Sequence, residues 1–376
     1  MGGGGSDAAR GPLLTHGHGP AVTIVRRLIR TERPPHALLL VGPRGVGKTT
    51  LALDLAAGLL CLADDPAERP CRACAACRKV ASGNHPDLHQ VQPDGAGEQI
   101  RIGQVQALAM ELALMSLEGR FRVAIIGAAQ RLNHDAQNAL LKTLEEPGPR
   151  TCLVLCADDS APLLPTVLSR CARPRLAPLP VETLAGLVAA RNGLPHSQAR
   201  GLALAAGGRP GQALRLAEHP EALLVRARVA RTLLDLLSAD RRSRLSASAD
   251  LVADGAALDA AQRGESSLSK GRLQPAERRR AVLAVLDAWR AVGRDLWLAI
   301  HEAWRSVRDA DLIDELRSSA PGIAAADLGR FLDRLDRMAL AVESYASPEL
   351  VLDSLLLAWP RQAPATRSHA AREQAA

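Results

Sequence analysis

Aromatic residues are scarce in this chain of 376 residues, where Phe, Trp and Tyr together make up 2%. Proteins that bind single-stranded nucleic acids commonly stack the bases on aromatic side chains, so the scarcity argues against base stacking here. The formal net charge is +7 and the pI is about 9.4. Contact with an acidic polymer through its phosphates therefore stays open.

Long hydrophobic runs are also missing. No run of about 18 apolar residues, the length that a membrane helix requires, is free of charge. Residues 1–11 lack the apolar core of a signal peptide, and although Gly2 and Ser6 fit a myristoylation signal, a flexible glycine-rich start is the simpler interpretation. We therefore expect a cytoplasmic protein with no membrane contact. Its 47% hydrophobic and 23% charged residues are typical of a globular chain.

Residues 42–49, GPRGVGKT, have the spacing of a phosphate-binding loop. The apolar run at 36–41 predicts a buried strand before the loop, and 49–60 predicts a helix after it. Glycines at this spacing let backbone N–H groups converge on phosphate oxygens at a helix N-terminus. The predicted nucleotide-binding residues are Gly42, Gly45, Gly47, Lys48, Thr49 and Thr50. A loop retained for weak or structural nucleotide binding is the main alternative.

Acidic residues are missing where such a site normally has them. The apolar strand predicted at 123–126 runs directly into Gly127 and Ala128. A hydrolysing enzyme usually ends this strand in Asp or Asp-Glu, which hold magnesium and position the attacking water. The sequence therefore predicts ATPase activity that is absent or very weak. Hydrolysis would need an acid from elsewhere, such as Asp158 or Asp159 after the strand predicted at 151–158.

Four of the seven cysteines are grouped at Cys61, Cys71, Cys74 and Cys77. Two-residue separations let tight turns aim several sulfurs at one tetrahedral centre, so the group predicts a structural zinc site. Four ligands fill the shell and leave no position for chemistry. A surface cluster of reduced thiols is the alternative. We expect the other three, Cys152, Cys156 and Cys171, to be buried as small hydrophobic residues.

Apolar strands alternate with helices up to Pro180, which predicts a parallel sheet covered on both faces, the α/β class. Asn133 is the predicted cap of one of these helices. Beyond Pro180 the pattern predicts helices alone, the last of them capped by Ser347. The polar segment 238–274 is expected to be partly mobile. The predicted divisions are 1–180, a small three-helix unit at 181–220, a helical domain at 221–360 and a disordered tail at 361–376.

These features together resemble the delta-prime subunits of the bacterial DNA polymerase III clamp loader, in the AAA+ superfamily. The resemblance is carried by the following stretches: HALLLVGPRGVGKTTLA, the four-cysteine insert, NHDAQNALLKTLEEPGP, LLPTVLSRC, AAGGRPGQALRLA and ASPELVLDSLLLAWP. It implies a nucleotide-binding domain with a zinc module, a helical lid and a helical collar that assembles a five-subunit ring. The implied partners are motor subunits, a delta subunit, the sliding clamp and, through the complex, primed DNA.

The resemblance also implies a division of labour. Delta-prime subunits resemble stators that do not drive the loading cycle, and Gly127 and Ala128 stand where motor subunits carry acids. Gly211 stands where motor subunits carry a lid arginine, although a shifted alignment would put Arg209 there. ATP or ADP is then bound without hydrolysis.

One catalytic role is implied for Arg170, in the SRC stretch. In related loaders this arginine reaches the neighbouring subunit's nucleotide site in trans and stabilises charge on the transferred phosphoryl group. A strand-end arginine in a salt bridge is the alternative. Lys142 either meets DNA phosphate or pairs with Glu145 or Glu146 one helical turn on. His16 and His18 either bind metal or form a loop at the adenine edge of the nucleotide site.

Two other function classes stay open at this stage. The chain could be a hydrolysing AAA+ motor, or it could be a zinc-containing DNA-binding scaffold in which the phosphate loop is vestigial.

Overall fold

The computed structural model describes residues 12–94, 99–263, 273–343 and 346–362. The chain divides into two compact units, residues 1–213 and 214–376. The glycine-rich start at 1–11 and most of the expected tail, residues 363–376, lie outside the described residues. Arg361 and Gln362 are still described, and the Gln362 side chain donates a hydrogen bond to the Ser318 carbonyl at 2.8 Å.

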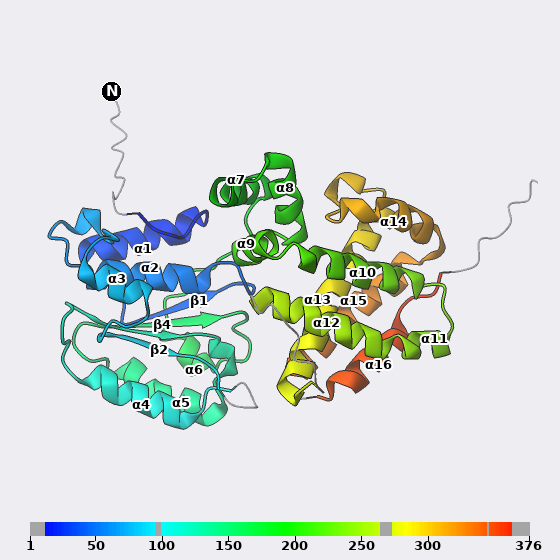
Figure 1. The fold of residues 1–376 in the computed structure, drawn as a ribbon. Coiled ribbons are helices and arrows are strands. Elements are labelled where there is room, and N and C mark those ends of the chain that lie inside the picture. The colour runs from blue at the N-terminus through cyan, green and yellow to red at the C-terminus, as the bar shows by residue number, and fades with distance from the viewer. Residues whose placement is uncertain (1–11, 95–98, 264–272, 344–345, 363–376) are drawn as a thin grey trace, which may run out of the picture. The chain divides into compact units, whose positions relative to one another are not determined.

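A parallel four-stranded sheet forms the centre of the first unit (Figure 1). Its strands, in spatial order, are β1 (Ala37–Val41), β4 (Thr151–Ala157), β3 (Arg122–Ile126) and β2 (Leu88–Val91). Residues 172 and 175 form isolated parallel bridges with Leu38 and Val41, so the chain also runs along the outer edge of β1. This confirms the three strands that the sequence predicts and the α/β class, and adds β2.

Helices cover both faces of this sheet, as its uniformly apolar strands require. One face packs against α1 (Gly19–Thr31), α2 (Lys48–Leu60) and α3 (Ala75–Ala81). The other packs against α4 (Ile102–Ala113), α5 (His134–Glu145) and α6 (Pro165–Leu168). Alternate strand residues divide between two cores: Leu38 and Val154 face the first, Leu39 and Leu155 the second. Loop 42–48 therefore lies between a buried strand and a buried helix.

Three short helices follow the sheet, as the turn signals predict. They are α7 (Val181–Asn192), α8 (His196–Ala205) and α9 (Pro210–Glu218). Gly193, which ends α7, has a φ of +66°, and Gly207 and Gly208 at the next turn also have positive φ. Glycine adopts this left-handed conformation without the steric cost that a Cβ brings.

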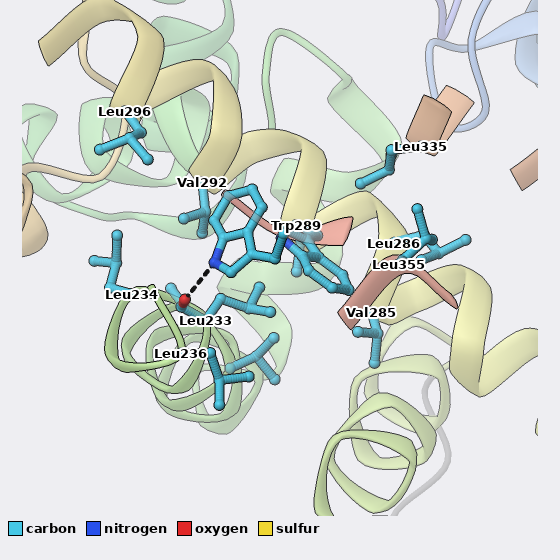
Figure 2. Packing of buried hydrophobic residues seen from close by; sticks show 14 of the residues in the cluster. Leu233, Leu234, Leu236, Val285, Leu286, Trp289, Val292, Leu296, Leu335 and Leu355 are labelled. Atoms are coloured by element: carbon cyan, nitrogen blue, oxygen red, sulfur yellow. Dashed lines mark hydrogen bonds between the residues drawn. The ribbon is translucent and has the colours of Figure 1, made fainter. Parts of the chain in front are cut away.

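The second unit is entirely helical in its described residues. Its elements are α10 (Glu221–Asp235), α11 (Arg241–Ser246), α12 (Ser248–Arg263), α13 (Pro275–Ile300), α14 (Ile313–Ser319), α15 (Ala325–Glu343) and α16 (Pro348–Ala358). Short 3-10 helices occur in the first unit at Pro66–Glu68 and Ala129–Arg131, and in the second at Trp304–Ser306, Ala310–Leu312 and Ala320–Gly322. Figure 2 shows Trp289 of α13 among Val285, Leu286 and Val292, in the core of this unit. The indole of Trp359 donates to the Leu233 carbonyl at 2.8 Å.

The segment 238–274 differs from the expectation of partial mobility. Most of it is helical, and Leu251 and Leu258 of α12 are buried against α13. A Cβ at Gly255 would lie 2.3 Å from the Ala281 carbonyl oxygen, so the two helices meet closely there. Small residues weaken the hydrophobic signal of this stretch, yet they permit the close approach. Residues 264–272 lie outside the described part of the chain.

The local predictions for caps and buried thiols are confirmed. The Asn133 side chain accepts from the Ala136 N–H, and the Ser347 hydroxyl accepts from the Leu350 N–H. Cys152, Cys156 and Cys171 are 0%, 1% and 9% exposed. Burial raises the pKa of Cys152 and Cys156 to about 12. None of the helices in the described ranges is long and apolar enough to cross a membrane.

Candidate functional site

The phosphate loop has the backbone that its glycines predict. Gly45 and Gly47 have φ of +80° and +112°, which residues with a Cβ rarely adopt. A Cβ at Gly42 would lie 2.2 Å from the Leu176 carbonyl oxygen, so only glycine fits. Thr49 and Thr50 lie in the first turn of α2, which begins at Lys48. All six predicted nucleotide-binding residues therefore lie together at one helix N-terminus, where N–H groups and the helix dipole favour an anion.

Lys48 is buried and its ammonium group is fully engaged. It donates to the carbonyls of Gly42 and Pro43 at 2.6 and 3.1 Å, and it pairs with Asp158 Oδ1 at 2.7 Å. Asp158 directly follows β4, which lies beside β1 in the sheet. A phosphate that uses Lys48 must therefore compete with this carboxylate.

Asp158 is one of the two acids, with Asp159, that could supply a hydrolysing site from the end of β4. Its second oxygen, Oδ2, accepts from Gln130 Nε2 at 3.1 Å, and its N–H donates to Gln130 Oε1 at 3.2 Å. Both carboxylate oxygens are thus occupied, by Lys48 and by Gln130. The carboxylate therefore links the phosphate loop, through Lys48, to Gln130.

The end of β3 has no acid, and a neighbouring side chain occupies the space beside it. A Cβ at Gly127 would lie 2.3 Å from the Gln92 Oε1 atom. The Gly127 N–H donates to the Val91 carbonyl at 2.9 Å, and Ala128 has a φ of +52°. An acidic side chain at 127 would first have to displace the exposed amide of Gln92.

The start of α9 rests on the phosphate loop through Gly211. Its N–H donates to the Gly45 carbonyl at 2.9 Å, and a Cβ at 211 would lie 3.1 Å from that same oxygen. A side chain here would crowd the loop backbone. Arg209, the other residue considered for the arginine position, is half-buried and donates from Nε to the Ala206 carbonyl at 2.9 Å.

The four predicted metal ligands converge. The Sγ atoms of Cys61, Cys71, Cys74 and Cys77 all lie within 4.8 Å of one another, and those of Cys61 and Cys74 are 4.0 Å apart. Sulfur ligands about 2.3 Å from a tetrahedral zinc ion are separated by comparable distances, so the donor set fits this metal.

Backbone N–H groups support these sulfurs as they would support thiolates. The N–H of Cys71 points at Cys61 Sγ, that of Cys74 at Cys71 Sγ and that of Cys77 at Cys74 Sγ, each at 3.4 Å. Burial acts to raise the pKa of Cys74, but hydrogen bonds from the N–H groups of Leu62 and Cys77 and from the neighbouring thiols bring it down to about 6. Burial raises the pKa of Cys61 and Cys77.

Arg170 follows α6 and is partly exposed. Its guanidinium pairs with Glu145 of α5 at 2.7 Å and donates to the Thr166 carbonyl at 2.9 Å. Glu145, one of the acids considered as a partner of Lys142, is thus paired with Arg170, and Lys142 is exposed. The structure shows Arg170 in a salt bridge, the contact that its structural role requires. To act in trans, the guanidinium would have to leave Glu145.

His16 and His18 lie in the segment before α1. His18 Nε2 donates to the Val46 carbonyl at 2.9 Å, whereas His16 Nδ1 contacts the Leu14 carbonyl at 2.8 Å. Neither histidine belongs to the cluster of metal-binding groups found among the described residues. His18 is therefore placed against the phosphate loop.

Sequence reasoning missed Asp54 and Arg72. Asp54 is a fully buried acid in the otherwise apolar helix α2, and Arg72 stands between two cysteine ligands; their side chains form an ion pair. An acid in an apolar helix face is a signal that could have drawn attention to Asp54, because a buried charge requires a partner.

Comparison with known proteins shows which proteins the N-terminal part of the chain resembles. Residues 17–180 match a family model described as DNA polymerase III, delta subunit. Subunit delta′ of DNA polymerase III from Bacillus subtilis is 39% identical over 168 residues, which are 45% of this chain and 50% of that protein. Over this region the chain is similar to the DNA polymerase III delta-prime subunit.

A second subunit type is also similar. DNA polymerase III subunit tau from Escherichia coli is 37% identical over 149 residues, 40% of this chain and 23% of that protein. The chain spans about half the length of its Bacillus delta-prime relative. Among solved structures, a DNA polymerase III gamma subunit-related protein from Thermotoga maritima matches 89% of this chain and 97% of its own at 19% identity, with a TM-score of 0.40.

Proposed function

We propose that this chain is a clamp-loader subunit of the delta-prime type, in the AAA+ superfamily, that binds ATP or ADP without hydrolysing it. It assembles with motor subunits and a delta subunit in a five-subunit ring that loads the sliding clamp on primed DNA. The likeness of residues 17–180 to delta-prime subunits supports this assembly. In this proposal residues 1–180 are the nucleotide-binding domain, 181–220 the lid and 221–360 the collar.

The observation that carries the non-hydrolysing role is the end of β3. Gly127 and Ala128 offer no ligand for magnesium and no group to position water, and the Gln92 amide fills the space beside them. Phosphoryl transfer depends on positioning and charge stabilisation, so a site without these groups binds nucleotide but turns it over poorly. Asp158 already accepts hydrogen bonds from Lys48 and Gln130, so we do not expect it to compensate.

The cysteine cluster is proposed to hold one structural zinc ion. When bound, zinc supplies cross-linking of residues 61–77 and no reaction chemistry, because four sulfurs complete its shell. The backbone N–H groups aimed at three of the sulfurs support thiolate ligands. The low pKa of Cys74 favours the deprotonated form that metal binding needs.

Arg170 is proposed to act in trans on a neighbouring motor subunit's nucleotide. Its pair with Glu145 joins two side chains that are 34% and 49% exposed. Pairs with this exposure contribute about 1 kcal/mol or less, so the guanidinium is readily released toward a phosphate. A phosphoryl group carries more charge than one carboxylate and forms stronger charge-assisted hydrogen bonds.

A reconstituted ring that carries Arg170→Ala tests this function. The isolated parent chain should show no ATPase activity above background, and the parent should enter a complex with motor and delta subunits. A trans-acting arginine is worth roughly 10³-fold or more at its own site, so the variant ring should lose one motor site's share of DNA-stimulated ATPase and should load clamps more slowly. Arg173→Ala, an exposed arginine three residues on, is the matched control.

The outcomes separate the alternatives. Equal turnover by the parent and Arg170→Ala rings would make Arg170 a structural residue. ATP hydrolysis by the isolated chain would instead favour a motor role, which the likeness to subunit tau keeps open. Failure to enter the complex would contradict the clamp-loader assignment itself.

A further inference from the structure

Residues 12–18, which we name the N-terminal strap, cross the first unit before α1. Hydrogen bonds to one carboxylate hold the strap in place. The N–H groups of Leu14 and Thr15 donate to the two oxygens of Asp54 at 3.0 and 2.8 Å. Asp54 belongs to α2, the helix that begins in the phosphate loop, and is 0% exposed. A buried carboxylate in an apolar helix would be costly without such partners.

The third partner of Asp54 comes from the cysteine module, residues 61–77. The Arg72 guanidinium pairs with Asp54 Oδ1, and its Nε donates to the Pro12 carbonyl at 3.1 Å. Arg72 directly follows the ligand Cys71 and has a left-handed backbone, with a φ of +59°. Arg72 of the module therefore contacts both the strap, at Pro12, and Asp54, the carboxylate that binds the strap.

The far end of the strap lies on the nucleotide site. His18 Nε2 donates to the carbonyl of Val46, between the two left-handed glycines of the phosphate loop. At Gly17 the strap passes so close to Leu179 that a Cβ would lie 2.3 Å from its Cδ2 atom. Leu179 in turn donates from its N–H to the Gly208 carbonyl at 2.7 Å, just before α9.

We propose that the cysteine module positions the nucleotide-binding loop through Arg72, Asp54 and the strap. Metal bound by the cysteines orders the backbone on both sides of Arg72, so that its guanidinium fixes residues 12–15 on Asp54. The fixed strap presents His18 to Val46 and keeps the loop in its binding conformation. The inference rests on the nucleotide and zinc binding proposed above and makes them reciprocal: metal strengthens nucleotide binding, and nucleotide strengthens retention of metal.

The test compares Arg72→Gln with Arg78→Gln in the full-length protein. Arg78 directly follows the ligand Cys77 in α3 and is exposed, and within the described part of the chain its guanidinium donates to the Ala73 carbonyl alone, at 2.6 Å. Both variants keep the four cysteines and should contain about one zinc per chain by mass spectrometry. Arg72→Gln should bind ATP about 5-fold or more weakly, the lower end of typical coupling between sites, while Arg78→Gln should bind like the parent.

In the second part of the test, ATP affinity is measured again after a chelator has removed the zinc. The parent should lose ATP affinity by a similar factor, and Arg72→Gln should lose little more, because both changes interrupt one connection and their effects are not additive. Additive losses, or a zinc-loaded Arg72→Gln that binds ATP like the parent, would overturn the proposal.

Amide hydrogen exchange distinguishes failure of this inference from failure of the proposed function. The N–H groups of Leu14 and Thr15 should exchange faster in Arg72→Gln and in the zinc-free parent than in the zinc-loaded parent. If the parent binds no nucleotide, the function proposed above is wrong, and unchanged exchange at these two amides would separately show that the module does not hold the strap.

Discussion

Single side chains decide the state of the phosphate loop. Lys48 is 9% exposed at its side chain, and its ammonium group donates to three oxygens of the protein. Two of those oxygens belong to the loop itself, so the loop folds around its own cation. The third belongs to Asp158, which is 39% exposed and is the one partner that a substitution can remove.

Asp158→Ala should therefore increase nucleotide affinity. Because the Asp158 carboxylate is partly exposed, we expect its pair with Lys48 to contribute about 1 kcal/mol, which corresponds to about a 5-fold lower Kd for ATP once Lys48 no longer has to exchange partners. Isothermal titration calorimetry would measure the change. Asp159→Ala is the matched control, since among the described residues the Asp159 carboxylate accepts only from the Ala161 N–H, at 3.0 Å. A weaker Kd in Asp158→Ala would mean that the carboxylate assists the bound state.

At the scale of elements, the cysteine module is joined to α2 from both ends. Cys61 directly follows α2, and Cys77 lies in α3 with its Sγ 3.9 Å from the Ala57 carbonyl of α2. Cys74 caps α3 by accepting from the Cys77 N–H. Because ligands and helix cap coincide, metal binding and the folding of α3 should be one event.

Cys74→Ser should release the metal and loosen α3. The parent should contain about one zinc per chain and the variant much less than one, because a serine hydroxyl is a poor replacement for a thiolate with a pKa of about 6. Inductively coupled plasma mass spectrometry checks the content. Cys171→Ser is the control, since Cys171 lies outside the cluster, and it should retain zinc. A zinc-free parent purified without chelator would refute the site.

At the scale of the whole molecule, each unit has its own hydrophobic core. The second unit also contains a buried cation, Arg244 of α11, which is 2% exposed. Its guanidinium donates to the carbonyls of Leu237, Leu356, Trp359 and Pro360. These carbonyls belong to the end of α10 and the end of α16, so one side chain satisfies the C-terminal groups of two helices.

Arg244→Met should destabilise the second unit while leaving the first intact. Removal of the donors leaves several buried carbonyls without partners, at a cost of about 3 kcal/mol or more. Thermal unfolding followed by circular dichroism should show an earlier transition, with zinc content and ATP affinity unchanged. Arg242→Met, at an exposed arginine of the same helix, should unfold like the parent. Simultaneous loss of zinc and nucleotide binding would show that the units fold as one.

The amino-acid sequence by itself determined the features that depend on neighbours along the chain. Gly42, Gly47 and Lys48 specify the loop because backbone conformation and helix start are local properties. Cys71, Cys74 and Cys77 predict a cluster because two-residue spacing lets tight turns aim their sulfurs at one centre, and Cys61 joins them from the end of α2. The same holds for the missing acids at Gly127 and Ala128, which follow a strand that its own apolar run defines.

The tertiary structure alone decided the pairings across long stretches of chain. Lys48 and Asp158 are 110 residues apart, and they meet because β1 and β4 are neighbours in the sheet. Asp54 and Arg72 meet because the cysteine module folds back on α2. Residue spacing along the chain does not predict such contacts, because they depend on strand order and on helix packing. The sequence did not predict α12 for the same reason. Its small residues give a weak hydrophobic pattern, and they matter because they let α12 pack closely against α13, which only the tertiary structure shows.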